Sequence, residues 1–364
     1  MKVLILGTGS AQYDAIRWCR DAEHEVHGCG LARVGPGAAE VDRFFEADLR
    51  DARRVADYCR EQGVELVYSV GSDIAMPTVG AVSAQLGLRH FVPEAVAATC
   101  QDKGRLRAAL GADFEWNVAH TVASSPVELA RWDRFPCIIK PVDSQGQRGV
   151  YACHGHKELA ARFAEAAAFS RAGRVIVEEF VEGQEISVNV HLAGGLARFL
   201  QTSDRFVYED QPGGIVREHR VPSLVAAADA VGPMVNETVR RLGISAGPVY
   251  FQAKVGKQGL RLLEVTPRLD GCHLWRLIRY STGMDLLDAA FRHLVDGAVP
   301  DLPAPTAVRP GALRFLSEKP GVRVNRAAFD TGRPDFLQWY YGQGEEVRPV
   351  NGHFEKVGYL VEME

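Results

Sequence analysis

Residues 249–271 read VYFQAKVGKQGLRLLEVTPRLDG, and this stretch decides the fold that we expect for the whole chain. Two short apolar runs flank the tetrapeptide GKQG, which is the pattern of a β-hairpin. A three-residue loop ending at Gly259 would place that glycine in the left-handed conformation that such loops require. The register that follows from this loop sets Gln252 directly opposite Glu264.

The predicted hairpin collects side chains that suit a metal ion bound together with a nucleotide. Thr266 lies two residues beyond Glu264 and therefore on the same face, because side chains alternate along a strand. With Gln252 this gives an amide, a carboxylate and a hydroxyl, oxygen ligands that suit Mg²⁺ beside phosphates. Arg268 follows closely and suits phosphate recognition. The alternative is that Glu264 is a solvent-facing strand residue paired with a neighbouring basic side chain.

The composition is that of an ordinary globular protein with room for roughly two to three domains. Of the 364 residues, 46% are hydrophobic and 24% are charged. The net charge of −4 without a basic block predicts no nucleic-acid and no membrane partner. The 7 cysteines are scattered, with no C-x-x-C pair, which argues against a zinc site or a disulfide framework and fits a reducing compartment. Because no apolar run resembles a signal peptide or a membrane span, we expect a cytoplasmic protein.

Residues 1–97 alternate strand and helix patterns, which predicts a parallel sheet with helices on its faces. The loop Gly7-Thr8-Gly9 suits a dinucleotide, but Gln12 stands where a third glycine would complete the fingerprint. A tight turn between strand and helix is the alternative. Asp48 and Asp73 fall at predicted strand ends, where open α/β sheets bind ligands, although either could instead cap a helix.

Three further segments contain groups that suit ATP. Residues 93–111 read as two helical pieces with Thr99 as an N-cap, and Lys103 opens the second piece, where a bound anion would relieve its conflict with the helix dipole. A strand at 135–141 ends near Lys140 and leads into a glycine-punctuated loop that could turn N–H groups toward phosphates, or form a plain hairpin. Residues 174–190 read as strand, apolar linker and strand, and the linker backbone could pair with an adenine edge.

These segments, in this order, resemble the ATP-grasp superfamily over roughly residues 1–297. The resemblance is carried by Asp102-Lys103, by Ile138-Ile139-Lys140-Pro141, by the run VEEFVEGQE at 177–185, and by Gln252 with Glu264-Val265-Thr266-Pro267-Arg268. Gln252 resembles the carbamoyl-phosphate synthetase and biotin carboxylase side of the superfamily, and the N-terminal stretch looks like the domain that precedes the core in carboxylate–amine ligases. The resemblance implies an α/β fold. Its parts would be an N-terminal parallel-sheet domain (1–97), an ATP-grasp core of two α+β subdomains (98–300) and a β-rich C-terminal region (301–364) without chemistry of its own.

The resemblance also implies a role for each matching residue. ATP phosphates would contact Lys103, Lys140 and the loop around Gly146. The adenine would lie beside Glu178 and Glu179 and the backbone of Phe180 and Val181, and the ribose beside Glu185. Mg²⁺ would be held by Gln252, Glu264 and Thr266. Arg268 would stabilise the transferring phosphoryl group, with Lys140 and Arg205 as further catalytic groups. The family usually has Asn at the position of Thr266, so that one metal would be held mainly by phosphates.

The implied reaction joins a carboxylate to an amine at the expense of ATP, through an acylphosphate. We expect the acid near Arg268, His273 and Arg276, because residues 269–279 follow the hairpin directly; the arginines of 198–222, otherwise an exposed loop, are the alternative. The expected partners are these small-molecule substrates, and a homodimer is the base-rate expectation. A carboxylase that uses bicarbonate, a nicotinamide-dependent oxidoreductase and a nucleotide-binding protein without catalysis are the competing hypotheses.

Overall fold

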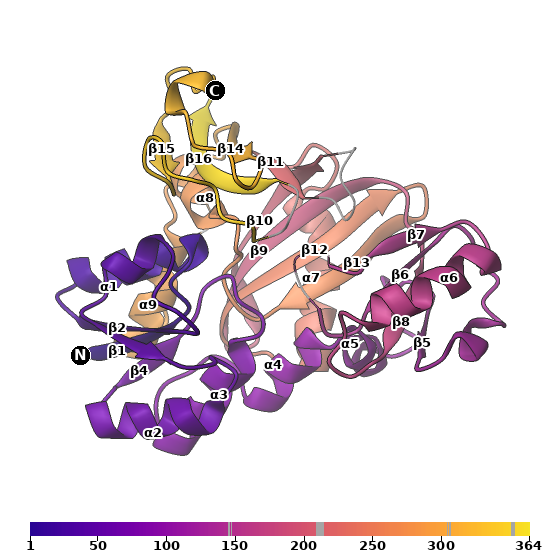
Figure 1. The fold of residues 1–364 in the computed structure, drawn as a ribbon, viewed down its shortest axis with the longest axis horizontal. Coiled ribbons are helices and arrows are strands. Elements are labelled where there is room, and N and C mark those ends of the chain that lie inside the picture. Colours follow the sequence, from indigo (N-terminus) through magenta and orange to yellow (C-terminus); the bar gives the residue numbers. More distant parts are fainter. Residues whose placement is uncertain (145, 147, 209–214, 304, 306, 351–353) are drawn as a thin grey trace.

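The computed structural model arranges the chain as three sheets with helices packed around them (Figure 1). It describes residues 1–144, 146, 148–208, 215–303, 305, 307–350 and 354–364. The predicted fold class is confirmed: a parallel N-terminal sheet precedes two α+β units, and strands dominate the C-terminal region. The boundaries predicted at residues 97 and 300 stay predictions.

The N-terminal sheet is parallel, with strand order β3-β2-β1-β4. Its strands are β1 (Lys2–Leu6), β2 (Glu25–Gly30), β3 (Arg43–Glu46) and β4 (Leu66–Tyr68), and its helices are α1 (Ser10–Asp21), α2 (Ala52–Gln62) and α3 (Met76–Leu86). The short 3₁₀ helix η1 (Pro36–Ala39) precedes β3. Sequence analysis missed β3 because this edge strand contains no buried side chain and so leaves no apolar run in the sequence.

The loop between β1 and α1 is the tight turn that was the alternative to a dinucleotide fingerprint. Gly7 has φ +98°, a conformation that favours glycine. The side chain of Gln12 folds back into the loop, where it accepts a hydrogen bond from the Gly9 N–H at 3.0 Å and donates one to the Val70 carbonyl. The residue that replaces the third glycine therefore fills the loop and ties it to the end of β4.

Two short helices connect the first sheet to the rest of the chain, α4 (Glu94–Gln101) and α5 (Lys103–Leu110). The predicted N-cap at Thr99 is wrong, since its hydroxyl donates to the Ala95 carbonyl within α4. Asp102 caps α5 instead, by accepting a hydrogen bond from the Arg105 N–H at 2.9 Å. Lys103 is the first residue of α5, as predicted.

The second sheet has four strands in the order β5-β8-β6-β7 and its own hydrophobic cluster. The strands are β5 (His120–Ala123), β6 (Cys137–Pro141), β7 (Tyr151–Cys153) and β8 (Val175–Glu179), with α6 (His156–Ala167) and the 3₁₀ helix η2 (Pro126–Leu129) beside them. β6 and β8 pair antiparallel, and Ile138 lies opposite Glu178. This pairing brings the lysine-bearing strand next to the strand that leads into the predicted adenine linker.

The third sheet has eight strands in the order β13-β12-β9-β10-β11-β14-β16-β15. Its strands are β9 (Gln184–Ala193), β10 (Leu196–Val207), β11 (Val216–Val221), β12 (Gly247–Gly256), β13 (Gly259–Thr266), β14 (Gly311–Glu318), β15 (Phe336–Trp339) and β16 (Glu355–Met363). Its remaining helices are α7 (Ala228–Leu242), α8 (Leu274–Thr282), α9 (Leu286–Asp296) and the 3₁₀ helix η3 (Arg326–Ala328). The predicted exposed loop at 198–222 is wrong, because most of it forms β10 and β11. The C-terminal strands extend the same sheet through β14.

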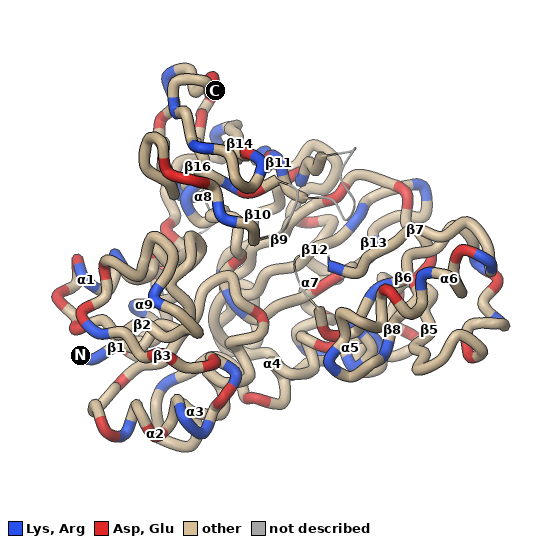
Figure 2. The backbone as a smooth tube through the Cα atoms, in the orientation of Figure 1, with Lys and Arg blue, Asp and Glu red and all other residues tan. Residues whose placement is uncertain are grey.

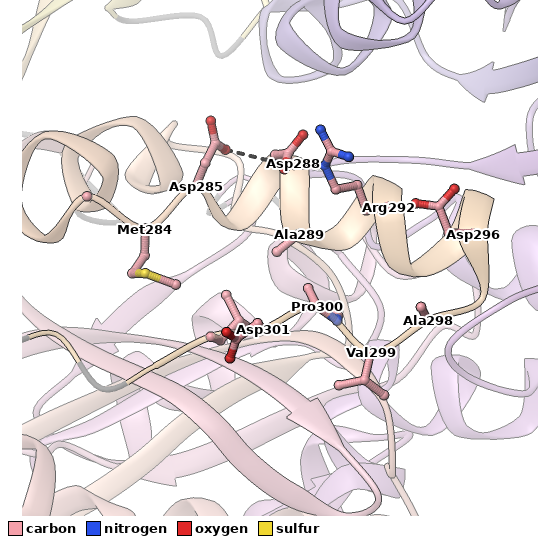
Figure 3. A pocket seen from close by; sticks show the side chains of 12 residues that line it. Met284, Asp285, Asp288, Ala289, Arg292, Asp296, Ala298, Val299, Pro300 and Asp301 are labelled. Carbon is pink, nitrogen blue, oxygen red and sulfur yellow. Dashed lines mark hydrogen bonds and ion pairs between the residues drawn. The ribbon is translucent and has the colours of Figure 1, made fainter.

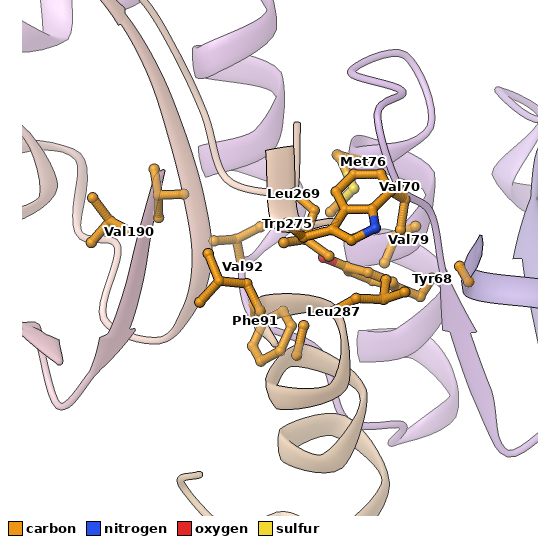
Figure 4. Close-up of a cluster of buried hydrophobic side chains, with 14 of the residues drawn as sticks. Tyr68, Val70, Met76, Val79, Phe91, Val92, Val190, Leu269, Trp275 and Leu287 are labelled. Carbon is orange, nitrogen blue, oxygen red and sulfur yellow. The ribbon is translucent and has the colours of Figure 1, made fainter. Parts of the chain in front are cut away.

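One hydrophobic cluster joins the N-terminal sheet, α9 and the eight-stranded sheet. Figure 4 shows Tyr68 and Val79 beside Trp275 and Leu287, with Phe91 toward the large sheet. The Tyr68 and Phe91 rings meet edge to face, with centroids 5.9 Å apart. This shared core packs the N-terminal domain against the large sheet. Among the described helices, none combines the length and apolar character that a membrane crossing requires.

Candidate active site

The β12–β13 hairpin pairs Gln252 with Glu264, as predicted, but it reaches this register by a different route. The loop has two residues rather than three, because Gly256 pairs with Gly259. A β-bulge follows Gln252, and the extra residue, Leu263, restores the predicted pairing. Gly259 has φ +81°, as the left-handed position of the prediction requires. The expected ligand pair is therefore present, and the bulge is what aims it.

Lys103 reaches the hairpin from the first turn of α5. Its Nζ lies 3.2 Å from Oε1 of Glu264 and donates to the Ser144 carbonyl at 3.1 Å. Burial raises the pKa of Glu264, but the Lys103 and Lys140 ammonium groups outweigh burial and hold that pKa below its usual value. Glu264 therefore stays ionised, and its side chain is still 37% exposed. An ionised, accessible carboxylate is what a metal ligand requires.

A buried ion-pair network lies behind these groups and centres on Glu178. Lys140 Nζ lies 2.6 Å from one oxygen of Glu178, and Arg107 Nε lies 2.9 Å from the other. Burial raises the pKa of Glu178, but Arg107 and Lys140 outweigh it and lower the pKa to about 2. The carboxylate predicted to face adenine is thus already bound to two cations, and its direct contact with adenine stays a prediction.

Glu185 stands in a row of cross-strand neighbours on one face of the large sheet. Arg205, Glu185 and Lys254 occupy paired positions on β10, β9 and β12, and Ser187 pairs with Gln252 two residues along. Arg205 forms an ion pair with Glu185, which also accepts a hydrogen bond from the Gln252 amide at 3.0 Å. Because that amide donates its NH₂ group, its carbonyl oxygen stays available as a ligand.

The predicted adenine linker is held by backbone hydrogen bonds. The Phe180 N–H donates to the Pro136 carbonyl at 3.0 Å, and Lys254 Nζ donates to the Val181 carbonyl at 3.1 Å. The Glu179 side chain accepts from the Ala119 N–H at 3.0 Å. The Phe180 ring is 37% exposed and lies under Lys254 Nζ, 5.1 Å from its centroid. The linker thus presents an exposed aromatic surface next to Lys254, the cross-strand neighbour of Glu185.

The glycine loop that precedes β7 is only partly described. Gly146 is exposed, and its neighbours Gln145 and Gln147 lie outside the described residues. Asp143 anchors the base of the loop through an ion pair with Arg171 at 3.6 Å. The proposed phosphate contact of Gly146 stays a prediction.

Arg268 connects the hairpin to the N-terminal domain. Its Nε donates to Oδ1 of Asp73 at 2.7 Å, and both groups are largely buried. Asp73 therefore serves as the partner of Arg268, whereas Asp48 binds Arg50 two residues away. Gly71 and Gly271 touch at the same junction, since a Cβ on Gly71 would lie 2.7 Å from the Gly271 Cα. This contact explains why glycine is needed at position 71, whereas a Cβ on Gly271 would meet the Gly71 backbone at an ordinary distance of 3.4 Å.

His273 and Arg276 do act together, as expected, but they meet on Asp14 of α1. Arg276 lies 2.9 Å and His273 lies 3.4 Å from the Asp14 carboxylate. The other side of each is bound by the C-terminal region: Tyr340 contacts His273 at 2.6 Å, and Arg276 donates to the Tyr359 hydroxyl at 2.8 Å. His273 is only 1% exposed. These partners occupy most of the binding capacity of both residues, so that their contact with a substrate stays a prediction.

Sequence reasoning missed Asp14 and Arg107, although each carries a weak signal. Arg107 follows Lys103 by four residues, so both point from one face of α5. Asp14 lies one turn after the glycine loop in α1, and nothing in its spacing distinguishes it from a solvated helix residue. Its function as the partner of His273 and Arg276 depends entirely on how the domains pack.

A groove of about 420 Å³ lies elsewhere, beside α9 (Figure 3). Asp285, Asp288 and Asp296 line it together with Arg292 and Pro300, and none of the predicted site residues belongs to its lining. Asp285 caps α9 through its carboxylate, and Asp288 pairs with Arg292 at 2.7 Å. The charges of Asp285, Asp288 and Arg292 are therefore explained by local structure, and the groove is not the candidate site.

Comparison with known proteins agrees with this geometry. Residues 133–274 match the family model of the ATP-grasp domain. The chain is 23% identical over 305 residues to the uncharacterised protein y4rH of Sinorhizobium fredii, covering 78% of this chain and 61% of that protein. It is 26% identical over 287 residues to a phosphoribosylamine–glycine ligase of Streptomyces coelicolor, covering 74% of this chain and 67% of that protein.

Solved structures share the fold over the whole chain. The N5-carboxyaminoimidazole synthetase of Staphylococcus aureus, complexed with ADP, has a TM-score of 0.80 at 13% identity and covers 100% of this chain and 93% of its own. A second structure is the biotin carboxylase domain dimer of the Hydrogenobacter thermophilus 2-oxoglutarate carboxylase, with MgADP and bicarbonate. It has a TM-score of 0.79 at 15% identity, and the match covers 100% of this chain and 86% of that one. Residues 133–274 therefore match the ATP-grasp domain, the whole chain shares the fold of these structures, and the resemblance inferred from its sequence is confirmed.

Proposed function

We propose that this protein is an ATP-dependent carboxylate–amine ligase that forms an amide bond through an acylphosphate and releases ADP and phosphate. The observation that carries the proposal is the arrangement of Glu264, Gln252 and Lys103 on one accessible face, beside Lys140 and Arg268. Lysines, an arginine and metal ligands suit phosphoryl transfer, in which positioning and charge neutralisation supply most of the catalysis. The match to a glycine ligase supports amide formation over other fates of an acylphosphate.

The residues present suit Mg²⁺ held together with a nucleotide. Glu264 supplies an ionised carboxylate and Gln252 a free carbonyl oxygen, and the buried hydroxyl of Thr266 has no hydrogen-bond partner among the described residues. Among the described residues, no group of three or more His, Cys, Asp or Glu side chains could hold a metal ion by itself. The nucleotide phosphates and water would supply the other ligands. When bound, the ion would neutralise phosphate charge.

Each residue of the site then has a defined task. Lys103 and Lys140 would hold the phosphates, and their own carboxylate partners keep both ammonium groups in place. The Phe180 ring would cover one side of the adenine, and Glu185 would accept the ribose hydroxyls. Arg268, fixed by Asp73, would stabilise charge on the transferring phosphoryl group without having to be ordered first. The acid and the amine would bind on the side of the site that faces the N-terminal domain.

We expect ATP with Mg²⁺ to stabilise the fold and NAD(H) to leave it unchanged. The reason is that the described site supplies cations for phosphates, whereas Gln12 fills the Gly7-Thr8-Gly9 loop that suggested a dinucleotide. At a ligand concentration 100 times the dissociation constant, binding should add about 2.7 kcal/mol to the free energy of unfolding. Thermal shift measures this directly. A shift with NADH and none with MgATP would overturn the assignment.

Thr266→Asn should fold and should lower the Mg²⁺ concentration that gives half-maximal ADP release. An amide oxygen is the better ligand, and the unpartnered hydroxyl that it replaces loses no hydrogen bond among the described residues. The measurement is a Mg²⁺ titration at saturating ATP, with Thr282→Asn at the partly buried C-terminal end of α8 as a control. An unchanged or higher half-saturation point would show that position 266 is not a metal position.

A carboxylase that uses bicarbonate is the second candidate, because the names of two structural neighbours refer to carboxyamino and carboxylase chemistry. A screen of carboxylic acids crossed with amines, read by ADP release, separates the two. Release that needs an acid and an amine supports the ligase, whereas release that needs bicarbonate and an amine alone supports the carboxylase. The neighbour that is a dimer supports the homodimer proposed here. A cytoplasmic location is also proposed.

A further inference from the structure

Lys356 is a lysine of the C-terminal strands that turns toward the candidate site. It lies on β16, and its Nζ stands 3.4 Å from the centre of the Phe315 ring and 3.7 Å from Sγ of Cys272. Cys272 belongs to the segment Leu269-Asp270-Gly271-Cys272, which follows Arg268 directly. The C-terminal region thus reaches the loop directly behind the metal hairpin.

The surroundings of Lys356 are rich in positive charge. No carboxylate of the described residues lies within ion-pair distance of its Nζ. Burial is the main cause that lowers the pKa of Lys356, and the nearby Arg205 guanidinium also lowers it, whereas Cys272 raises it. His219 is the cross-strand partner of Arg205 and is fully buried. Burial, Arg205 and Lys356 all lower the pKa of His219, so its ring is neutral. Lys356 and Arg205 therefore lie in one region whose imidazole adds no charge, and Glu185 pairs with Arg205 but not with Lys356 among the described residues.

Several buried polar atoms around these cations have no partner among the described residues. They are both ring nitrogens of His219, Oγ of Ser203 and Oδ2 of Asp270. Ser203 is on β10, two residues before Arg205 and on the same face, and Asp270 is 1% exposed. Buried polar groups are normally satisfied, and unsatisfied ones mark places where water or a ligand completes the structure. Figure 2 shows that basic and acidic residues are interspersed along the rest of the chain.

We propose that Lys356, together with Arg205 and the thiol of Cys272, binds an anionic group of the acid substrate, so that the C-terminal strands complete the active site. The group is a carboxylate or a phosphate, since both accept from an ammonium and a guanidinium. This inference rests on the proposed ligase function. It moves the acid away from His273 and Arg276, whose partners are already in place, and it gives the 301–364 region a function that the sequence did not predict.

Cys272 offers a readout that does not depend on turnover. It is partly exposed, whereas Cys19, Cys29, Cys59, Cys100, Cys137 and Cys153 are buried. Iodoacetamide should therefore modify Cys272 first, and peptide mapping locates the label. An anion held between Lys356 and Arg205 would cover the thiol, so we expect inorganic phosphate or malonate to slow labelling of the native protein several-fold. Protection by phosphate alone assigns a phosphate group, and protection by malonate alone assigns a carboxylate.

Lys356→Met removes the charge and keeps most of the side-chain length, whereas Lys356→Arg keeps the charge. We expect Lys356→Met to abolish protection and to raise the KM for the acid about tenfold or more, with the KM for ATP within about twofold. Lys356→Arg should retain protection, as should Lys257→Met in the exposed hairpin loop. Equal labelling with and without both anions, or full protection in a folded Lys356→Met, would overturn the proposal. MgATP stabilisation in the same variants reports separately on the ligase assignment, so the two failures are distinguishable.

Discussion

Glu264→Ala should lower turnover by about a thousandfold while leaving the fold intact, because the loss of one charged ligand at a phosphoryl-transfer site has effects of this order. Glu264 is the only carboxylate in the proposed Mg²⁺ set, and its 37% exposure means that no tightly packed core depends on it. Lys103 would lose its partner but keep its hydrogen bond to the Ser144 carbonyl. ADP release at saturating substrates, with circular dichroism as the check on folding, measures the effect.

Glu165→Gln is the matched control, since Glu165 is an exposed carboxylate on α6 that pairs with its neighbour Arg162. Its turnover should equal that of the native protein. If Glu264→Ala kept its turnover and its Mg²⁺ dependence, the hairpin would be structural only, and the metal would have to be held by other residues.

Glu178→Ala should have the largest effect on stability of any single change in the site. Breaking a buried ion pair by removing one partner costs about 3–5 kcal/mol, because the other charge is left without compensation. Glu178 is 3% exposed, and its loss would leave Arg107 and Lys140 together in the interior. Urea unfolding followed by fluorescence gives the change in the free energy of unfolding.

The same network makes a prediction about pH. The pKa of Glu178 is about 2 in the folded protein, below the value of about 4.3 expected in the unfolded chain. A carboxyl group with a lowered folded pKa stabilises the fold above its unfolded pKa, and this stabilisation is lost as the pH falls from about 4.3 toward 2. Glu178→Ala should therefore show a weaker dependence of stability on pH in this window.

The variant Glu237→Gln on α7 tests whether burial of the ion pair, rather than a lowered pKa alone, determines the loss of stability. Its pKa is also about 2, lowered by Arg240 and Arg241, but its pair lies at the surface. Exposed pairs contribute little, so the variant should unfold close to the native midpoint. If Glu178→Ala and Glu237→Gln were equally stable, the network around Glu178 would not be the buried, desolvated cluster described above.

The sequence alone determined the local elements and their chemical order. Apolar periodicity predicted the alternating strands and helices of residues 1–97, and glycine placement located the hairpin that pairs Gln252 with Glu264. These features depend on residues close in sequence, where strand alternation and turn geometry restrict the backbone strongly. The predicted pairing of Gln252 with Glu264 is confirmed although the predicted loop length is wrong, because a bulge at Leu263 compensates for the two-residue turn. Such bulges leave no clear signal in a pattern of apolar residues.

Only the tertiary structure decided which partner each charged side chain has. Arg107 and Glu178 are 71 residues apart, Lys356 and Cys272 are 84 apart, and Asp14 and His273 are 259 apart. An Arg or Asp on a helix reads the same in sequence whether it faces water or a buried partner from another domain. Whether such a side chain is buried depends on which surfaces pack together in the hydrophobic core. A buried charge then needs a partner, because an unpaired charge in the interior is strongly destabilising. That is why the sequence was enough to predict which types of residue belong to the site. The contacts of His273 and Arg276 with Asp14, and of Lys356 with Cys272, could be found only in the packed fold.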